Sequence, residues 1–243
     1  MSGHSKWHNI QKTKGAQDAK RAAAFTKIAK KLIVAVKEGG GITDPANNSR
    51  LATVITKAKA ANMHNDNIKR CLEKAAGAGG GDSYETITYE GYGPGGVAVI
   101  VETMTDNRNR TAGEVRHYFD KFGGNLGATG CVGWQFDQKG VIILEKDGKD
   151  EDETMMVCLD AGAEDIDTEG EVIEVYTAPD DFGAVNDALE AAGYKILSAE
   201  VEMVPQNYTK LTDEDDIKNM QKLLDAMDDN DDVQNVWHNW DEE

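Results

Sequence analysis

The chain has 243 residues, of which 40% are hydrophobic, and its formal net charge at pH 7 is −18. This length exceeds one average domain, so we expect two or three domains with buried cores. The longest apolar runs, such as residues 97–101, are too short to span a membrane, and the first residues lack the pattern of a secretory signal. Three widely spaced cysteines are typical of reduced thiols, so a cytoplasmic location is expected.

The charges are distributed unevenly along the chain. Residues 1–78 hold 15 Lys and Arg against 5 Asp and Glu, whereas residues 79–243 hold 11 against 39. The two balances are therefore +10 and −28. Such a division predicts a basic module that contacts a polyanion, nucleic acid first, and an acidic remainder that repels the same polyanion.

The segment 3–37 is the most basic part of the chain, with Asp18 as its only acid. Its apolar residues recur at spacings of three and four, which predicts a helix with one packing face: Phe25, Ile28, Ala29, Leu32 and Val36. Lysines on the opposite side form either a solvated face, the common case for a single helix, or a surface for a polyanion. Because of the charge division we favour the second. The predicted nucleic-acid-binding residues are Lys6, Trp7, His8, Lys12, Lys14, Lys20, Lys27, Lys30 and Lys31.

Three helices are predicted in the first third of the chain. The first covers about 16–38 and ends at the glycines 39–41, which tolerate a left-handed cap. Asp44 and Pro45 predict the start of the second helix, and Asn65 or Asp66 predicts the cap of the third, which ends at Gly77. These helices form a small bundle, and the glycine-rich residues that follow predict a linker and a domain boundary.

After this linker the pattern becomes mostly extended. Strands are predicted at 84–92 and 97–104, then a helix from Arg110 with Thr111 and Glu114 as a capping box. The later elements are predicted as strands at 132–136 and 141–145, a helix at 151–161, strands at 163–167 and 172–177, a helix at 180–192 and a strand at 195–204. From residue 141 onward this order is βαββαβ, the ferredoxin-like arrangement.

The C-terminal part is predicted as a helix capped by Thr212 and a strand at 233–240. One helix and one strand cannot bury their own apolar faces, so we expect them to join the strands that follow the linker. The predicted fold class is therefore α+β. It comprises an N-terminal three-helix domain (1–78), a discontinuous α/β domain (82–131 with 206–243) and a ferredoxin-like α/β domain (132–205) inserted into it.

No motif in the chain predicts catalysis, a metal, a cofactor or a small-molecule substrate. The glycines of 91–96 lead into a strand instead of opening a helix, so a dinucleotide-binding loop is rejected. His4 and His8 have no third ligand nearby. Asp228, Asn230 and Asp232 occupy alternate positions, as calcium ligands would. However, Val233 stands where the calcium loop needs glycine and Asn239 where it needs glutamate, so we expect an acidic solvated loop there. No membrane partner is predicted.

The stretch 105–111 is a second candidate site. It lies between a buried strand and a helix start, where backbone N–H groups and two guanidinium groups can hold a phosphate or carboxylate. In the alternative interpretation, Arg108 and Arg110 pair with the surrounding acids, and Asp106 or Asn109 only caps the helix. Both interpretations stay open, and the residues concerned are Asn107, Arg108 and Arg110.

Four motifs, spread in order over the whole chain, resemble the YebC/PmpR family: residues 3–7 with Asn9-Ile10, residues 89–96, residues 105–111, and Gly123-Gly124 with Leu126-Gly127. The resemblance implies a three-domain α/β protein with a helical N-terminal domain that acts as a DNA-binding transcriptional regulator in the bacterial cytoplasm. The family is similar to the mitochondrial translational activator of cytochrome c oxidase subunit I, and bacterial members have been linked to ribosomes stalled on proline-rich stretches. The start of the chain lacks the pattern of a transit peptide, which favours a bacterial member.

Two non-enzymatic functions follow from these observations. In the first, the basic helices bind duplex DNA and the protein regulates transcription. In the second, the same surface binds ribosomal or messenger RNA, with Trp7 and His8 stacking on unpaired bases, and the protein relieves stalled translation. The helices carry no obvious set of base-reading side chains, which counts against sequence-specific DNA readout.

Overall fold

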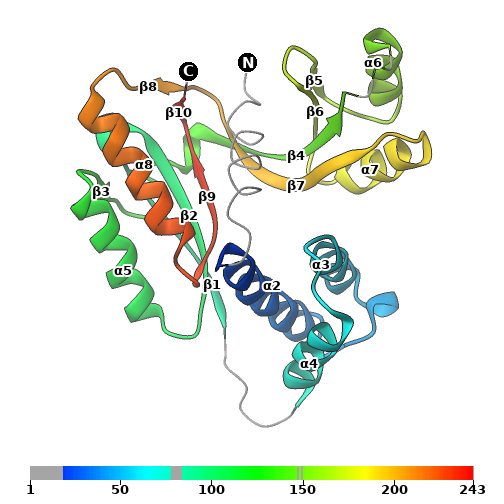
Figure 1. Ribbon diagram of the computed structural model, residues 1–243, viewed down its shortest axis with the longest axis horizontal. Helices are drawn as coiled ribbons and strands as arrows, with labels where there is room; N and C mark the ends of the chain where they lie inside the picture. Colours follow the sequence, from blue (N-terminus) through cyan, green and yellow to red (C-terminus); the bar gives the residue numbers. More distant parts are fainter. Residues whose placement is uncertain (1–18, 78–83, 147, 149, 243) are drawn as a thin grey trace. The chain divides into compact units, whose positions relative to one another are not determined.

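The computed structural model describes residues 19–77, 84–146, 148 and 150–242 (Figure 1). The described residues divide into two compact units. One contains the described residues up to 133 together with 211–238, and the other contains 134–210 together with the residues from 239. Each unit is an assembly of helices and antiparallel sheet, so the predicted α+β class is confirmed. Within the described residues, no helix combines the length and apolar character needed to cross a bilayer.

The first unit begins with three helices, α2 (Ala19–Glu38), α3 (Ser49–Ala60) and α4 (Asn65–Ala76). Helix α2 packs against both of the others, and their shared core contains Leu32, Leu51 and Ile68. As predicted, α2 ends at glycines, and Gly40 and Gly41 adopt φ values of 70° and 84°. A side chain on either glycine would be strained there, which explains why the helix stops at this point.

The starts of several helices differ from the prediction. His64 precedes α4 in place of the predicted cap Asn65 or Asp66, and Asp213 caps the helix that begins at Glu214 in place of Thr212.

The second helix also starts differently. Asp44 caps a short 3-10 helix, η1 (Pro45–Asn47), and accepts a hydrogen bond from the backbone N–H of Ala46. The cap of α3 is Asn48, whose Oδ1 accepts from the N–H of Leu51 at 3.0 Å. The amide nitrogen of Asn48 donates to the carbonyl oxygens of Ala35 and Ile42. Asn48 therefore joins the end of α2 to the start of α3, a role that the local pattern does not reveal.

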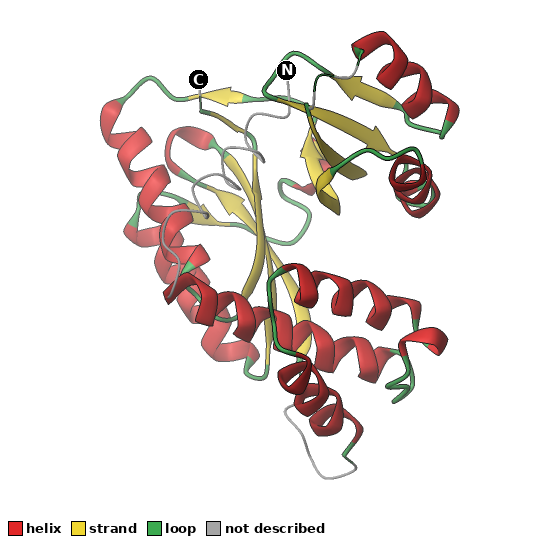
Figure 2. Ribbon diagram, turned by 45° about the vertical axis from the view of Figure 1, so that its right-hand side comes forward, coloured by secondary structure: helices red, strands yellow, loops and turns green. Residues whose placement is uncertain are grey.

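The sheet of the first unit has the strand order β3-β1-β2-β9, and all its pairs are antiparallel. Its strands are β1 (Glu85–Tyr92), β2 (Ala98–Thr105), β3 (Asn125–Leu126) and β9 (Val233–His238). The 3-10 helix η2 (Pro94–Gly96) joins β1 to β2. Helices α5 (Arg108–Lys121) and α8 (Glu214–Asp228) contact each other and lie on one face of this sheet (Figure 2). The C-terminal strand β9 thus pairs with β2, far from it in sequence.

The second unit contains the βαββαβ arrangement that the sequence predicts. Its elements are β4 (Phe136–Glu145), α6 (Glu151–Asp160), β5 (Asp165–Asp167), β6 (Val172–Thr177), α7 (Phe182–Ala191) and β7 (Ile196–Pro205). The sheet order is β5-β6-β4-β7, again antiparallel throughout. The predicted pair of strands at 132–136 and 141–145 is instead a 3-10 helix, η3 (Gly133–Gln135), followed by one continuous strand. Short strands β8 (Thr209–Lys210) and β10 (Trp240–Asp241) pair in parallel.

A buried carboxylate, that of Glu90 in β1, holds the loop of residues 127–133 that follows β3. Glu90 is 7% exposed, and its carboxylate accepts hydrogen bonds from the backbone N–H groups of Gly130, Val132 and Gly133 at 2.7–3.0 Å. Burial raises the pKa of Glu90, but these three hydrogen bonds outweigh it and the net pKa lies below its ordinary value. The loop is therefore held by an ionised side chain.

We predict that Glu90→Gln lowers the free energy of unfolding by about 2 kcal/mol, because charge-assisted hydrogen bonds to backbone N–H groups are lost. The same change should speed alkylation of Cys131, which lies within the loop. Urea denaturation and mass mapping of the labelled thiol measure the two effects. Glu85→Gln is the matched control, since Glu85 is an exposed residue of the same strand. Equal stability and equal labelling in both variants would contradict a role for Glu90 in holding this loop.

Candidate nucleic-acid interface

The structure describes the side chains of three of the predicted nucleic-acid-binding lysines, Lys27, Lys30 and Lys31, all on α2. Lys30 is only 8% exposed, and Lys27 and Lys31 are half-buried. The other predicted positions lie outside the described residues, or in the case of Lys20 have a described backbone only: Lys6, Trp7, His8, Lys12, Lys14 and Lys20. These three lysines therefore do not form the simple solvated face that helical periodicity suggests.

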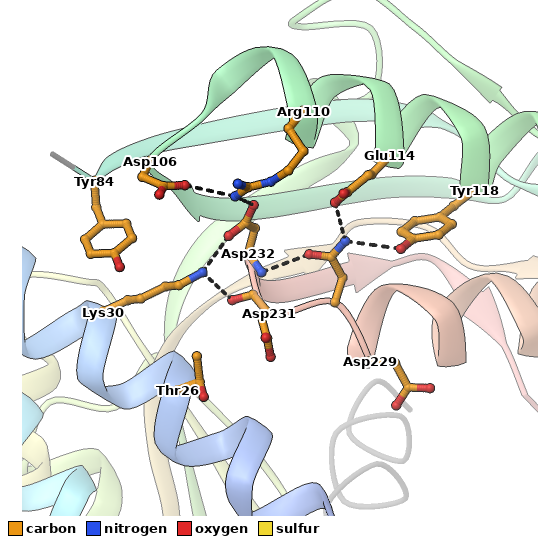
Figure 3. Close-up of a pocket in the computed structure, with 11 residues that line it drawn as sticks. Thr26, Lys30, Tyr84, Asp106, Arg110, Glu114, Tyr118, Asp229, Asp231 and Asp232 are labelled. Atoms are coloured by element: carbon orange, nitrogen blue, oxygen red, sulfur yellow. Dashed lines mark hydrogen bonds and ion pairs between the residues drawn. The ribbon is translucent and has the colours of Figure 1, made fainter. Parts of the chain in front are cut away.

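The ammonium group of Lys30 is bound by the loop that joins α8 to β9. Its Nζ donates to Oδ1 of Asp232 at 2.5 Å and to the carbonyl oxygen of Asp231 at 2.8 Å (Figure 3). The ring of Tyr84 completes the surroundings, with its centroid 5.6 Å from the same nitrogen. These contacts direct the ammonium group of Lys30 into the protein.

Asp232 is the centre of a buried network, and its side chain is 6% exposed. Its second oxygen, Oδ2, accepts from Nη2 of Arg110 at 2.7 Å and from the hydroxyl of Thr111 at 2.7 Å. The hydroxyl of Thr105, at the end of β2, lies 3.1 Å from the same oxygen. One carboxylate thus joins α2, α5 and the end of β2 to the start of β9.

The beginning of α5 explains how these groups converge. Asn107 caps the helix, because its Oδ1 accepts from the backbone N–H of Arg110 at 3.1 Å. The helix therefore starts earlier than predicted, and the predicted capping box of Thr111 and Glu114 is wrong. Thr111 instead turns its hydroxyl toward Asp232, and Glu114 accepts a hydrogen bond from the side chain of Asn230 at 2.8 Å.

The second predicted site, at residues 105–111, is largely occupied by these internal contacts. Asn107 serves as a helix cap, and Nη2 of Arg110 contacts Oδ1 of Asp106 at 2.9 Å as well as Asp232. Arg108, at the first position of α5, is exposed. A contact between an anionic partner and Asn107, Arg108 or Arg110 stays a prediction.

The network shifts the pKa values of Asp232 and Arg110. Burial raises the pKa of Asp232, but the hydrogen bonds from Arg110, Lys30 and Thr111 outweigh it and the net pKa lies well below the ordinary value. The same bonds to Asp232 and Asp106 raise the pKa of Arg110. The group is therefore a stable assembly of ions in which two cations neutralise a buried anion.

The prediction of an acidic solvated loop at 228–232 is wrong for two of its residues. Asp232 is buried, and Asn230 is half-buried with its amide nitrogen donating to Glu114 and to the hydroxyl of Tyr118. Of the four aspartates in this stretch, only Asp232 turns inward, whereas Asp228, Asp229 and Asp231 stay exposed. Sequence reasoning missed Asp232 because its partners lie more than a hundred residues away.

These residues border an open polar pocket of about 500 Å³ (Figure 3). Its lining contains the cations Lys30 and Arg110 and five carboxylates, on Asp106, Glu114, Asp229, Asp231 and Asp232. An excess of carboxylates repels a polyanion, so the pocket is not suited to bind phosphate groups. Within the described part of the chain, no three His, Cys, Asp or Glu side chains are arranged to hold a metal ion.

The exposed positive charge of the described helices lies mainly beyond α2. Besides Arg50, which forms an ion pair with Glu38, four basic residues are exposed on α3 and α4: Lys59, Lys69, Arg70 and Lys74. Lys69 approaches Glu73 at 3.9 Å, but both side chains are more than 60% exposed, so the pair has little effect on the field. These residues contribute to the positive charge balance of residues 1–78. The prediction of binding residues nevertheless chose the lysines of α2, because the apolar periodicity identified only that helix as having a basic face.

We predict that Asp232→Asn lowers the free energy of unfolding by about 3 kcal/mol, because it leaves Lys30 and Arg110 without their buried anion. The control Asp231→Asn removes a neighbouring exposed carboxylate and should change stability by about 0.5 kcal/mol or less. Urea denaturation followed by circular dichroism compares the two. Equal effects of both substitutions would show that the buried network does not hold α2 against the sheet.

The lowered pKa of Asp232 also predicts how this contribution depends on pH. A carboxyl whose folded pKa is depressed contributes fully above its unfolded pKa of about 4, and the contribution is lost as pH falls toward the folded pKa. The stability difference between the wild type and Asp232→Asn should be constant from about pH 5 to 8 and shrink by about 1.4 kcal/mol per unit below about pH 4. A difference that stays the same at pH 3 would mean that the ionised form of Asp232 is not responsible.

Comparison with known proteins places this architecture in a family. Residues 5–78 match the model of the TACO1/YebC N-terminal domain, and residues 84–240 match the model of the TACO1/YebC second and third domain. A protein of Acetivibrio thermocellus named "Probable transcriptional regulatory protein" is 58% identical over 241 residues, covering 99% of each chain. A protein of the same name from Clostridium beijerinckii is 57% identical over 248 residues, covering 100% of each chain.

A solved structure is also similar. The crystal structure of a conserved hypothetical protein from Aquifex aeolicus shares 42% identity and a TM-score of 0.83, covering 92% of this chain and 91% of that chain. The domain models, the relatives and the fold agree with the resemblance that the four sequence motifs carry. The chain belongs to the TACO1/YebC family.

Proposed function

We propose that the protein is a non-enzymatic, nucleic-acid-binding regulator of gene expression, and that it acts in the cytoplasm as a DNA-binding transcriptional regulator. The names of its relatives support a regulatory role. The observation that carries the proposal is the concentration of positive charge on the N-terminal helices of an otherwise acidic chain.

The described side chains of residues 23–77 include ten Lys and Arg against four Asp and Glu. Even with the ammonium groups of Lys27 and Lys30 directed to internal carboxylates, the helices keep an excess of positive charge. Lysine and arginine bind phosphates regardless of base sequence, and the release of counterions makes this binding strongly dependent on salt. The acidic remainder of the chain, with 11 basic against 39 acidic residues after position 78, disfavours any other approach of the nucleic acid.

In this proposal the contact surface combines the exposed cations of α3 and α4 with the basic residues predicted from sequence. The first group is Lys59, Lys69, Arg70 and Lys74. The second group is Lys6, Lys12, Lys14, Lys20 and Lys31, with Trp7 and His8 available to stack on bases that are unpaired. In the free protein Lys27 and Lys30 are not counted in this surface, because each has an internal anion.

We predict that the triple variant Lys59→Glu, Lys69→Glu and Arg70→Glu of the full chain binds a 30-base-pair DNA duplex at least about tenfold more weakly at 100 mM salt. Its plot of log affinity against log salt should flatten by up to about 0.9 for each phosphate that the variant no longer neutralises. Fluorescence anisotropy with labelled duplex provides both values.

The matched control reverses three exposed lysines elsewhere in the first unit, Lys121, Lys218 and Lys222. This control changes the net charge by the same amount. It should nevertheless weaken binding much less, because its residues lie outside α3 and α4. Equal decreases in affinity in the two variants would refute a localised surface. A labelled ribosomal RNA fragment, measured in parallel, decides the type of nucleic acid. A clear preference for this fragment over the duplex would favour a role of the protein in translation over a role in transcription.

A further inference from the structure

We propose that the last residue of α8 and the loop after it, residues 228–232 and hereafter the acidic loop, compete with nucleic acid for the lysines of α2. In the free protein this loop then occupies part of the basic surface, and a bound phosphate backbone displaces it from one lysine. This inference rests on the proposed function, since it concerns the regulation of the same surface.

The lysines on one side of α2 already bind oxygen atoms of the protein itself. Lys27 and Lys30 are three residues apart on α2 and therefore point to the same side. Lys27 donates to the carbonyl oxygen of Asp228 at 2.7 Å and lies 3.4 Å from its Oδ1. Lys30 has the same kind of surroundings, one carbonyl oxygen from Asp231 and one carboxylate oxygen from Asp232. Each ammonium group thus contacts oxygen atoms of one acidic loop.

The loop carries a dense negative charge beside these lysines. Four of its five residues are aspartates, and Asp228, Asp229 and Asp231 are exposed whereas Asp232 is buried. Closely spaced exposed carboxylates repel one another and any approaching phosphate. A nucleic acid that reaches α2 must therefore replace an internal anion of the same sign.

The two lysines differ in how readily this exchange occurs. The side chain of Lys30 is 10% exposed and that of Asp232 is 6% exposed, so the pair is part of the core. In the pair of Lys27 and Asp228, the side chain of Lys27 is 16% exposed and that of Asp228 is 59% exposed, and their side-chain contact is 3.4 Å long. An ion pair with one solvent-exposed partner is weakened by salt and contributes little to stability, whereas a pair buried on both sides is costly to break. Lys27 is therefore the exchanging position and Lys30 the anchor that keeps α2 in place.

The test uses the full chain with Asp228→Asn, Asp229→Asn and Asp231→Asn combined. These residues are exposed, and the substitutions leave the backbone carbonyl oxygens and Asp232 in place. Removing the competing carboxylates should strengthen binding to the labelled 30-base-pair duplex about tenfold at 100 mM salt. The control combines Asp160→Asn, Asp187→Asn and Glu190→Gln, three exposed acids of the second unit, and produces the same change in net charge.

A second arm identifies the lysine concerned. In a Lys27→Gln background, the loop substitutions should strengthen binding no more than the control substitutions do, because the cation that they release is missing. Urea denaturation confirms that each variant is folded.

The outcomes separate this inference from the proposed function. A wild-type protein that binds neither the duplex nor the RNA fragment refutes the function itself. A wild-type protein that binds, with a loop variant no tighter than its control or with the same gain in the Lys27→Gln background, leaves the function standing and overturns the competition.

Discussion

The first unit depends on the interactions of one buried carboxylate, that of Asp232. Taking an ionised side chain out of water is unfavourable unless cations and hydrogen-bond donors surround it. Lys30, Arg110 and Thr111 supply them, and they come from α2 and α5. Asp232 lies directly before β9, so the network joins α2, the first helix that the structure describes, to a strand near the C-terminal end of the chain. Hydrogen-bonded ion pairs require a defined geometry between these elements, whereas the packing of apolar side chains is not directional.

This network changes what the basic helices offer to a partner. Counted along the sequence, every lysine of α2 adds to a positive surface. In the folded unit, Lys30 neutralises an internal anion and Lys27 faces Asp228, while cations on α3 and α4 remain exposed. The positive charge available to a polyanion therefore differs from the formal charge. The affinity of this surface for any polyanion would depend on the balance between internal and external anions.

Most elements are predictable because their signals are local. Glycines end α2 and α5, and the strand Val172–Thr177 has the predicted limits. One error is the predicted strand at 132–136, which is a 3-10 helix leading into β4. The other errors concern helix starts, where several residues compete as caps within one turn. Asp44 and Asn48 are both good caps, and Asn48 starts the longer helix because its amide also reaches the carbonyl oxygens of Ala35 and Ile42. Local pattern contains no information on such distant acceptors.

The sequence by itself determined the α+β class, the ferredoxin-like order of the second unit, the division of charge and the family, because periodicity, composition and motifs are properties of neighbouring residues. Tertiary structure alone decided which lysines face solvent and which acid is buried. Lys30 and Asp232 are 202 residues apart, and no pattern near either residue specifies the other. Their pairing follows from the addition of β9 to the edge of β2, which brings the acidic loop against α2. Burial then makes the pairing obligatory, since neither charge is stable there without the other.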